Sequence, residues 1–433
     1  MADFRVECSG CGATVDAATH LPFRCPNAIE NDNIDHVLVR HLNGADATFA
    51  ESAELNPFVR YRRLSLGYHL ARANSLSDDQ YVAIVEDLDR AIAEVDGKGF
   101  RITPFAPSAS LSDSCGAEVW VKDETGNVSG SHKARHLMGV MIYLRVLEVA
   151  NLPAAHGLRD RRLALASCGN AALAAAVIAR AADWPLDVFI PPDAEDSVKR
   201  RLGELGATLH ICKREQGQTG DPCYLAFRKA LENGSLSFGI QGNETGIAIE
   251  GGQTLGWEMA DALRQADTDL DMLFVQVGGG ALGSACYRGL VEARDGGVIN
   301  QLPKLFTVQT LGAYPLKKAF GAFRIHGSTE NAARNRSAYM NPWPSEPHSV
   351  AHGILDDETY DWLALVRGMA ATGGDALVAN EDCLREANRI GRESTGIDVS
   401  HTGSAGLAGL MDTFRGKRDA GLKAAVLFTG EER

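Results

Sequence analysis

One lysine stands in a sequence context that suits amine chemistry. Residues 129–135 read Ser-Gly-Ser-His-Lys-Ala-Arg, and they follow an apolar run of strand length at 118–122 and open a helical pattern at 136–148. Withdrawal from water lowers the pKa of a lysine and leaves a free amine, which can form a Schiff base with an aldehyde. Taken alone, Lys133 is more simply interpreted as an exposed residue in the first turn of a helix, so the interpretation depends on the rest of the chain.

A glycine-rich stretch follows the apolar run 271–277. Residues 278–285 read Gly-Gly-Gly-Ala-Leu-Gly-Ser-Ala and lead into a helical pattern at 282–293. Glycines let several backbone N–H groups converge on one phosphate, and the helix N-terminus adds a favourable dipole. A dinucleotide loop is the alternative, but no acidic residue follows about 20 positions on in a clear next strand. A Walker loop is excluded, since no Gly-Lys-Ser/Thr follows.

A third motif, Ser-Cys-Gly-Asn at 167–170, lies between an expected strand at 163–166 and an alanine-rich helix at 171–182. A hydroxyl, an amide and helix-start N–H groups at the carboxyl end of a strand suit a carboxylate ligand. Gly-Asn alone is also ordinary turn chemistry. The order lysine, asparagine turn, glycine loop is the specific signal.

With these motifs the chain, from about residue 102 onward, resembles the pyridoxal-phosphate enzymes of the tryptophan synthase β family (fold type II). Within that family it looks most like threonine synthase-like proteins and threonine/serine dehydratases. Further shared segments are Glu250-Gly251-Gly252-Gln253-Thr254 and the ending Thr429-Gly430.

The resemblance implies roles for particular residues. Lys133 would be the catalytic Schiff-base lysine, Asn170 would bind the cofactor's pyridine hydroxyl, and Thr429 would face its ring nitrogen. The substrate carboxylate would lie at the turn Ser167, Cys168, Gly169 and Asn170. The cofactor phosphate would be held by the backbone of Gly278, Gly279, Gly280, Ala281 and Leu282. Two interpretations of His132 stay open: contact with the cofactor phosphate or proton transfer, and packing through a backbone hydrogen bond. For His352 a structural role is favoured over a place in the lining of the site.

The expected fold is α/β, because apolar runs of strand length alternate with helical runs. The resemblance implies two parallel-sheet lobes with the site between them, the smaller lobe at about 130–240 inserted in the larger. We expect this catalytic region to span residues 46–433. Residues 1–45 form a separate zinc-ribbon-like unit, and residues 46–101 are helical in pattern, with Ser77 as the N-cap of a helix at 78–95.

The N-terminal unit contains a potential metal site. Cys8 and Cys11 have the spacing of one zinc knuckle, and Cys25 follows after thirteen residues without a partner two or three positions later. His36 is the candidate for a fourth ligand. A zinc site at Cys8, Cys11 and Cys25 and a degenerate ribbon without metal are therefore both open.

Composition narrows the function classes. The 433 residues carry a net charge of −13, which argues against a nucleic-acid surface. No run approaches 18 uninterrupted apolar residues and the N-terminus lacks an apolar signal core, so we expect a cytoplasmic protein with no membrane partner. Nine cysteines in so long a chain indicate free thiols rather than a disulfide framework. The resemblance implies a homodimer that acts on a small amino acid.

Three functions remain open from the sequence. The favoured one is a lyase that uses pyridoxal 5'-phosphate for β-elimination from a small hydroxy or related L-amino acid, giving ammonia and a 2-oxo acid. Ala134 and Ala171 favour it, because they stand where threonine synthases place an acidic and a hydroxyl residue. The second is threonine synthase, which acts on phosphohomoserine; the N-terminal cysteines and the Thr429-Gly430 ending support it. The third is a non-catalytic cofactor- or zinc-binding regulator.

Overall fold

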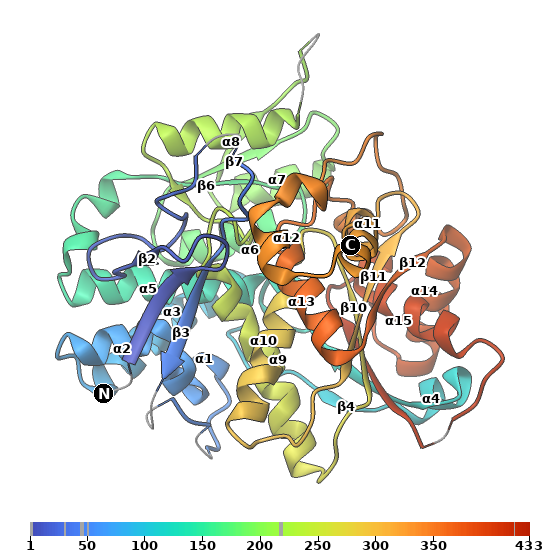
Figure 1. The fold of residues 1–433 in the computed structure, drawn as a ribbon. Helices are drawn as coiled ribbons and strands as arrows, with labels where there is room; N and C mark the ends of the chain where they lie inside the picture. The colour runs from blue at the N-terminus through green and yellow to red at the C-terminus, as the bar shows by residue number, and fades with distance from the viewer. Residues whose placement is uncertain (1–2, 30–31, 44–46, 50–51, 216–219, 420) are drawn as a thin grey trace.

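The chain folds around three sheets (Figure 1). The computed structural model describes residues 3–29, 32–43, 47–49, 52–215, 220–419 and 421–433. The strand orders are β12-β11-β10-β13-β5-β4, β8-β7-β6-β9 and β2-β1-β3. The first two sheets carry the three motifs, and the third is formed by the N-terminal segment.

The six-stranded sheet is parallel except for β4, which pairs antiparallel with β5. Its strands are β4 (Phe105–Pro107), β5 (Glu118–Asp123), β10 (Met272–Gln276), β11 (Lys304–Thr310), β12 (Asp375–Ala379) and β13 (Lys423–Phe428). One face packs against α9 (Ala248–Gln265), α10 (Ala281–Asp295), α11 (Pro315–His326), α12 (Thr329–Arg334) and α13 (Trp362–Thr372). The other face packs against α4 (Ala109–Cys115), α14 (Glu381–Thr395) and α15 (His401–Phe414). Covering both faces of a parallel sheet is the arrangement expected for α/β proteins.

The four-stranded sheet is parallel throughout. Its strands are β6 (Leu163–Ala166), β7 (Leu186–Ile190), β8 (Thr208–Ile211) and β9 (Leu236–Ser237). Around it lie α5 (Lys133–Val149), α6 (Asn170–Ala181), α7 (Asp196–Glu204) and, in a separate small apolar cluster, α8 (Pro222–Glu232). α5 has almost no exposed face, because its residues are buried nearly all round.

The N-terminal segment is an antiparallel sheet of β1 (Asp3–Cys8), β2 (Thr14–Val15) and β3 (Leu38–Asn43). Helices α1 (Pro57–Arg60), α2 (Leu66–Ala73) and α3 (Asp78–Asp96) follow. Ser77 caps α3, and Gln80 completes a capping box, as the sequence predicts. Val6, Cys25 and Leu38 share one apolar core with α3, α5 and α6, so the segment is packed onto the body of the molecule.

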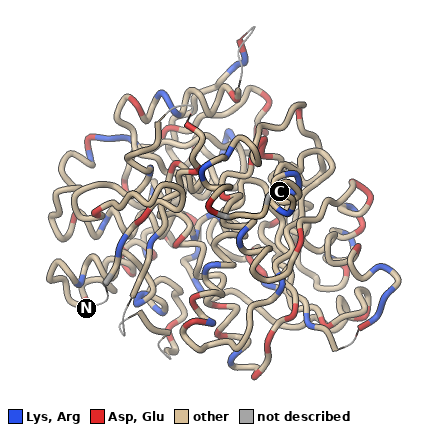
Figure 2. The backbone as a smooth tube through the Cα atoms, in the orientation of Figure 1, with Lys and Arg blue, Asp and Glu red and all other residues tan. Residues whose placement is uncertain are grey.

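The structure confirms the predicted α/β class and the strands predicted at 118–122, 163–166 and 271–277, which are β5, β6 and β10 with ends that differ by at most one residue. No strand was predicted at β4, which is three residues long, or at β12, which is only partly buried at the sheet edge. No single described helix is long and apolar enough to cross a membrane. α5 and the short helical turns after it reach that length and composition only when taken together, and they are bent by 107°. Figure 2 shows basic and acidic residues interspersed along the described chain.

Candidate active site

Lys133 is the first residue of α5, and a tight turn delivers it there from β5. Ser129 and Gly130 in that turn have φ angles of 53° and 65°, the left-handed region that favours glycine. A side chain at Gly130 would overlap the carboxylate of Glu431. Burial lowers the pKa of the half-buried Lys133, and the carboxylate of Asp356 opposes that shift. Across the described residues the Lys133 amine has no hydrogen-bond partner, which leaves it available to react.

Beneath Lys133 lies a fully buried group of two cations and two carboxylates. Arg135 Nε donates to Glu124 Oε2 at 2.7 Å, and Arg135 Nη1 donates to Glu258 Oε1 at 2.5 Å. Lys122 pairs with the second oxygen of Glu258 and also donates to the Thr103 carbonyl at 2.8 Å. Because β5, α5 and α9 each contribute members, the group fixes the start of α5 against its neighbours and so positions Lys133.

The glycine loop lies between β10 and α10, with the N-terminus of α10 directed at it. Gly280 has a φ of 98°, and a Cβ there would lie 2.9 Å from the Thr359 side chain. A Cβ at Gly278 would overlap the carboxylate of Asp356, and one at Gly279 would lie 2.9 Å from the ring of Tyr360. The loop therefore has no room for side chains, and the segment 354–361 covers it.

Asp356 shows that this loop accepts an anion. The backbone N–H of Gly279 donates to the Asp356 carboxylate, which is also attracted by Lys133. Burial nonetheless raises the pKa of Asp356. A carboxylate of the chain itself thus lies where converging N–H groups and a helix N-terminus favour a phosphate.

The Ser-Cys-Gly-Asn turn joins β6 to α6, and Asn170 is the first helical residue. The Gly169 N–H donates to Ser167 Oγ at 3.5 Å. The Asn170 amide nitrogen lies 2.9 Å from the position that a Cβ on Gly430 would take, so the turn reaches the segment after β13. Desolvation raises the pKa of the Cys168 thiol. The carboxylates of Asp193, Asp221 and Glu195 add to this shift, so the surroundings of the turn are acidic.

Thr429 follows β13 and is tied to the lysine turn. Gln276 Nε2 donates to Thr429 Oγ1 at 2.7 Å, which leaves the hydroxyl proton of Thr429 free to be donated elsewhere. The Thr429 carbonyl accepts from the backbone N–H of His132 at 3.1 Å, and Ser131 forms a β-bridge with Gly430. The fold therefore brings the three motifs together with the segment Thr429–Gly430.

His132 has a second neighbour that sequence analysis did not identify. Its Nδ1 lies 3.1 Å from the Thr429 carbonyl, and its Nε2 is buried without a partner. Burial, followed by the charge of Lys133, lowers the pKa of His132 well below its usual value, so the ring is neutral. His136, one turn along α5, is likewise buried, and its ring lies 5.9 Å from that of His132. His352 is exposed in a short 3-10 turn.

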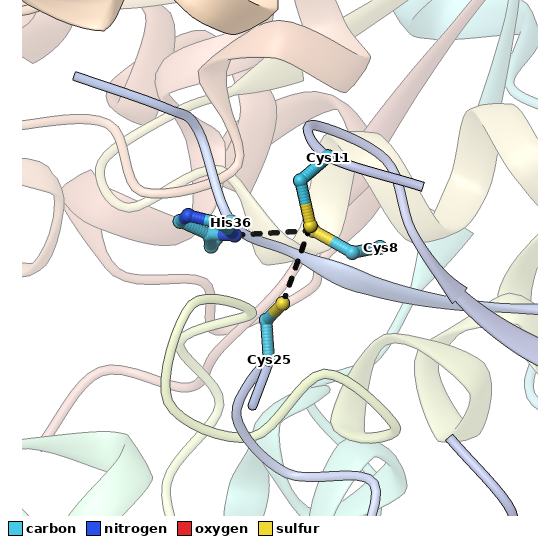
Figure 3. Close-up of side chains that lie close together, drawn as sticks. All are labelled: Cys8, Cys11, Cys25 and His36. Atoms are coloured by element: carbon cyan, nitrogen blue, oxygen red, sulfur yellow. Dashed lines mark hydrogen bonds between the residues drawn. The ribbon is translucent and has the colours of Figure 1, made fainter. Parts of the chain in front are cut away.

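The predicted metal ligands converge, and His36 joins them (Figure 3). One ligand atom from each of Cys8, Cys11, Cys25 and His36 lies within 4.8 Å of the others. Cys8 Sγ is 3.4 Å from His36 Nδ1, and Cys11 Sγ is 3.6 Å from Cys25 Sγ. These separations suit tetrahedral zinc, whose bonds are about 2.0–2.3 Å long. His36 Nε2 lies 2.9 Å from a carboxylate oxygen of Asp32, the orienting contact usual for a metal-bound histidine.

Comparisons with known proteins agree with this geometry. The family model described as pyridoxal-phosphate dependent enzyme matches residues 98–430. Threonine synthase of Mycobacterium tuberculosis is 26% identical over 313 residues, covering 71% of this chain and 75% of that protein. The serine dehydratase-like protein of Rattus norvegicus is 27% identical over 226 residues, covering 52% of this chain and 61% of that protein. Among solved structures, maize serine racemase has a TM-score of 0.58 at 17% identity, covering 81% of this chain and 93% of its own.

Proposed function

Because this chain belongs to the pyridoxal-phosphate-dependent enzyme family, we propose that it is a lyase that catalyses β-elimination from a small, unphosphorylated L-amino acid. The products are ammonia and a 2-oxo acid. We favour an unphosphorylated substrate because the surroundings of the Ser-Cys-Gly-Asn turn are acidic.

The residues fit the cofactor. The backbone of Gly278–Gly280 and the start of α10 form a site for an anion near the free amine of Lys133. The Asp356 carboxylate accepts a hydrogen bond from this backbone, which shows that the site can hold a negative charge. The Thr429 hydroxyl has a proton to donate to a ring nitrogen, because it accepts from Gln276. When bound, pyridoxal phosphate supplies the electron sink for negative charge at the substrate α-carbon.

The proton transfers fall to Lys133 in this proposal. Burial lowers the pKa of Lys133, which increases the share of neutral amine that can take the α-proton. The hydrogen bonds of buried Arg135 to Glu124 and Glu258 hold the start of α5 in place. The Lys133 amine therefore keeps one position throughout the reaction. A neutral hydroxyl partner at Thr429 limits protonation of the ring and so favours elimination over transamination.

The substrate carboxylate would lie at the Ser-Cys-Gly-Asn turn, where the N-terminus of α6 offers N–H groups. A phosphohomoserine substrate would bring a second phosphate to a region that already holds Asp193, Asp221 and Glu195. Asp357 is close enough to Asp221 and Glu358 for their charges to raise its pKa beyond the effect of burial. Asp193, Glu195 and Asp221 are exposed, so water weakens their repulsion of a dianion, but a second phosphate beside them is still disfavoured. We therefore favour a substrate whose β-substituent is neutral or positively charged.

A panel of amino acids tests the proposal. The cofactor-loaded protein is incubated with L-serine, L-threonine, 2,3-diaminopropionate, 3-hydroxyaspartate and phosphohomoserine, and ammonia, 2-oxo acid and phosphate are measured. We expect equal amounts of ammonia and oxo acid from L-serine or L-threonine, or two ammonia per oxo acid from 2,3-diaminopropionate, whose β-amine is also released, and no product from the Lys133→Ala variant. Phosphate release with threonine formation, and no ammonia from the others, assigns the protein as a threonine synthase instead.

Covalent attachment gives a separate check on the lysine. Borohydride reduction of the loaded protein, followed by peptide mass spectrometry, is expected to place the reduced cofactor on Lys133. An adduct on Lys122 contradicts the whole assignment.

We also propose that Cys8, Cys11, Cys25 and His36 bind one zinc ion with a structural role. All four positions are taken by protein ligands, which is the pattern of a structural rather than a catalytic zinc site. Metal analysis of the purified protein is expected to give one zinc per chain. Fewer than about 0.2 zinc per chain after purification without chelators favours the degenerate ribbon.

A further inference from the structure

A cavity of about 640 Å³ lies between the N-terminal sheet and helices that pack on the six-stranded sheet. The loop that carries Cys8 and Cys11 forms one wall together with β3, and α10, α12 and α13 form the opposite wall. Its volume is in the range of cavities that hold small molecules. Neither Lys133 nor any residue of the Ser-Cys-Gly-Asn turn lines it.

Two arginines line this cavity without partners. Arg288 on α10 and Arg367 on α13 are both partly buried, and within the described chain neither has a hydrogen bond or an ion pair. Burial lowers the pKa of each guanidinium. The carboxylates of Asp361 and Glu292 oppose the shift of Arg288, and Asp35 opposes that of Arg367, while the charges of Arg40 and Arg367 add to the shift of Arg288. Two like charges are thus held close enough to repel each other in a partly dehydrated space. A bound anion would offset both the repulsion between the two guanidinium groups and the free-energy cost of their partial dehydration.

Glu292, Asp35 and Asp361 in the walls attract the two arginines but form no ion pair with them in the described chain, and other groups engage Glu292 and Asp35. Glu292 accepts from Arg40 Nη1 at 2.8 Å and from Trp257 Nε1 at 3.0 Å. Asp35 accepts from Trp362 Nε1 at 2.8 Å. Burial raises the pKa of Asp361 to about 7, so this carboxyl carries only part of its charge at neutral pH.

The remaining lining is largely apolar. Val37, just before β3, and Val39 in β3 line the cavity on one side, and Val291 and Leu363 from the helices line it on the other. A ligand that fills the space therefore needs an apolar body as well as a charge. Inorganic phosphate alone satisfies only the arginines.

We propose that this cavity binds a small amphipathic anion, whose carboxylate or phosphate pairs with Arg288 and Arg367 and whose apolar body lies against Val37 and Val39. The planar guanidinium groups suit either kind of anion, because each presents several donors in a fixed arrangement. A ligand bound here contacts the N-terminal sheet and the large lobe together. It therefore holds the cysteine-bearing loop against α10, the helix that begins at the glycine loop.

Calorimetry on the full-length, cofactor-loaded protein tests the site, since the loaded cofactor fills the phosphate cradle near Lys133. The probes are phenyl phosphate and benzoate, which carry an anion and a ring, with inorganic phosphate and neutral benzyl alcohol as comparisons. We expect saturable binding of one aromatic anion and weaker or no binding of the two comparison compounds. The difference between phenyl phosphate and benzoate decides which anion the arginines prefer.

Variants identify the residues. We expect the double variant Arg288→Gln/Arg367→Gln to bind the aromatic anion about tenfold more weakly or worse. Arg288→Lys, which keeps the charge, is expected to retain part of the affinity. Arg294→Gln is the matched control, because Arg294 lies on the same helix, pairs with Asp295 and does not line the cavity. Thermal unfolding monitored by circular dichroism confirms that each variant is folded.

Three results overturn the proposal. The first is no saturable binding of either aromatic anion to the wild-type protein. The second is equal binding by the wild-type protein and the double variant. The third is a wild-type oligomer that the double variant dissociates, which would assign the two arginines to contacts between copies of the chain.

Discussion

Replacing Arg135 by methionine tests whether the buried charges beneath Lys133 hold the site together. Arg135 is completely buried and is the cation shared by Glu124 and Glu258. Methionine fills a similar volume without the charge, so packing is largely kept. Lys122 still pairs with Glu258 in the variant but lies 3.9 Å from Glu124. One ammonium is then left for two buried carboxylates.

The expected loss follows from that imbalance. Removing one partner of a buried ion pair costs about 3–5 kcal/mol, because a charge stays buried without compensation. We therefore expect the free energy of unfolding in urea to fall by about 3–5 kcal/mol at pH 7. The double variant Arg135→Met/Glu124→Gln is expected to recover part of this loss, because it removes the stranded charge. Arg389→Met is the surface control: Arg389 pairs with Glu386 and Glu393 on an exposed helix face, and little change is expected.

The pH dependence gives a second test of the same reasoning. Burial raises the pKa of Glu258, but the charges of Arg135 and Lys122 outweigh it and the pKa lies below its usual value. A carboxyl with a depressed folded-state pKa adds stability above its unfolded pKa, and this stability is lost as the pH falls through the folded value. In Arg135→Met that advantage shrinks, so the stability difference from wild type should narrow as the pH falls below about 4.3. A loss under about 1 kcal/mol at pH 7, or a difference that does not change with pH, refutes the account.

Three further predictions concern the other sites. Asp356→Asn is expected to bind pyridoxal phosphate about tenfold more tightly in a fluorescence titration, because the anion that competes for the Gly279 N–H is removed; unchanged affinity would mean that Asp356 and the cofactor do not share the cradle. Gly279→Val is expected to lose cofactor affinity in the same titration, since its side chain would meet the ring of Tyr360, and retained affinity would place the phosphate elsewhere. Cys25→Ser is expected to lose bound zinc by metal analysis and to unfold at a lower temperature, whereas unchanged melting with and without a chelator would mean that the four ligands hold no structural metal.

The sequence identified the parts of the site that are local motifs. Lys133, the Ser-Cys-Gly-Asn turn and the glycine loop each lie on a strand-to-helix connection, where a few residues specify both the turn and its N–H groups. The α/β class was predictable for the same reason, because strands and helices alternate in sequence. Short or partly exposed strands such as β4 and β12 carry too little pattern to be found this way.

Groups that act across the fold could not be predicted in this way. Asp356 lies in a run of three acidic residues that reads as a surface loop, and only the fold places its carboxylate on the glycine loop. His136 fits the helical pattern of α5 like any core residue, yet its ring lies beside that of His132. His36 was named from the sequence as the candidate fourth ligand, but it stands eleven residues from Cys25, and only the pairing of β1 with β3 shows that it reaches Cys8.

The place of β13 in the large sheet has a consequence for how the protein is made. β13 lies between β10 and β5, although it follows β5 by about 300 residues. While the ribosome is still producing the chain, β5 and β10 therefore lack their shared central neighbour, and each presents an open edge to other nascent chains. Thr429 and the backbone contacts to the lysine turn arrive with that strand. We therefore expect the cofactor site to be completed only after β13 has been made, and unfinished chains to be prone to association through the two open edges.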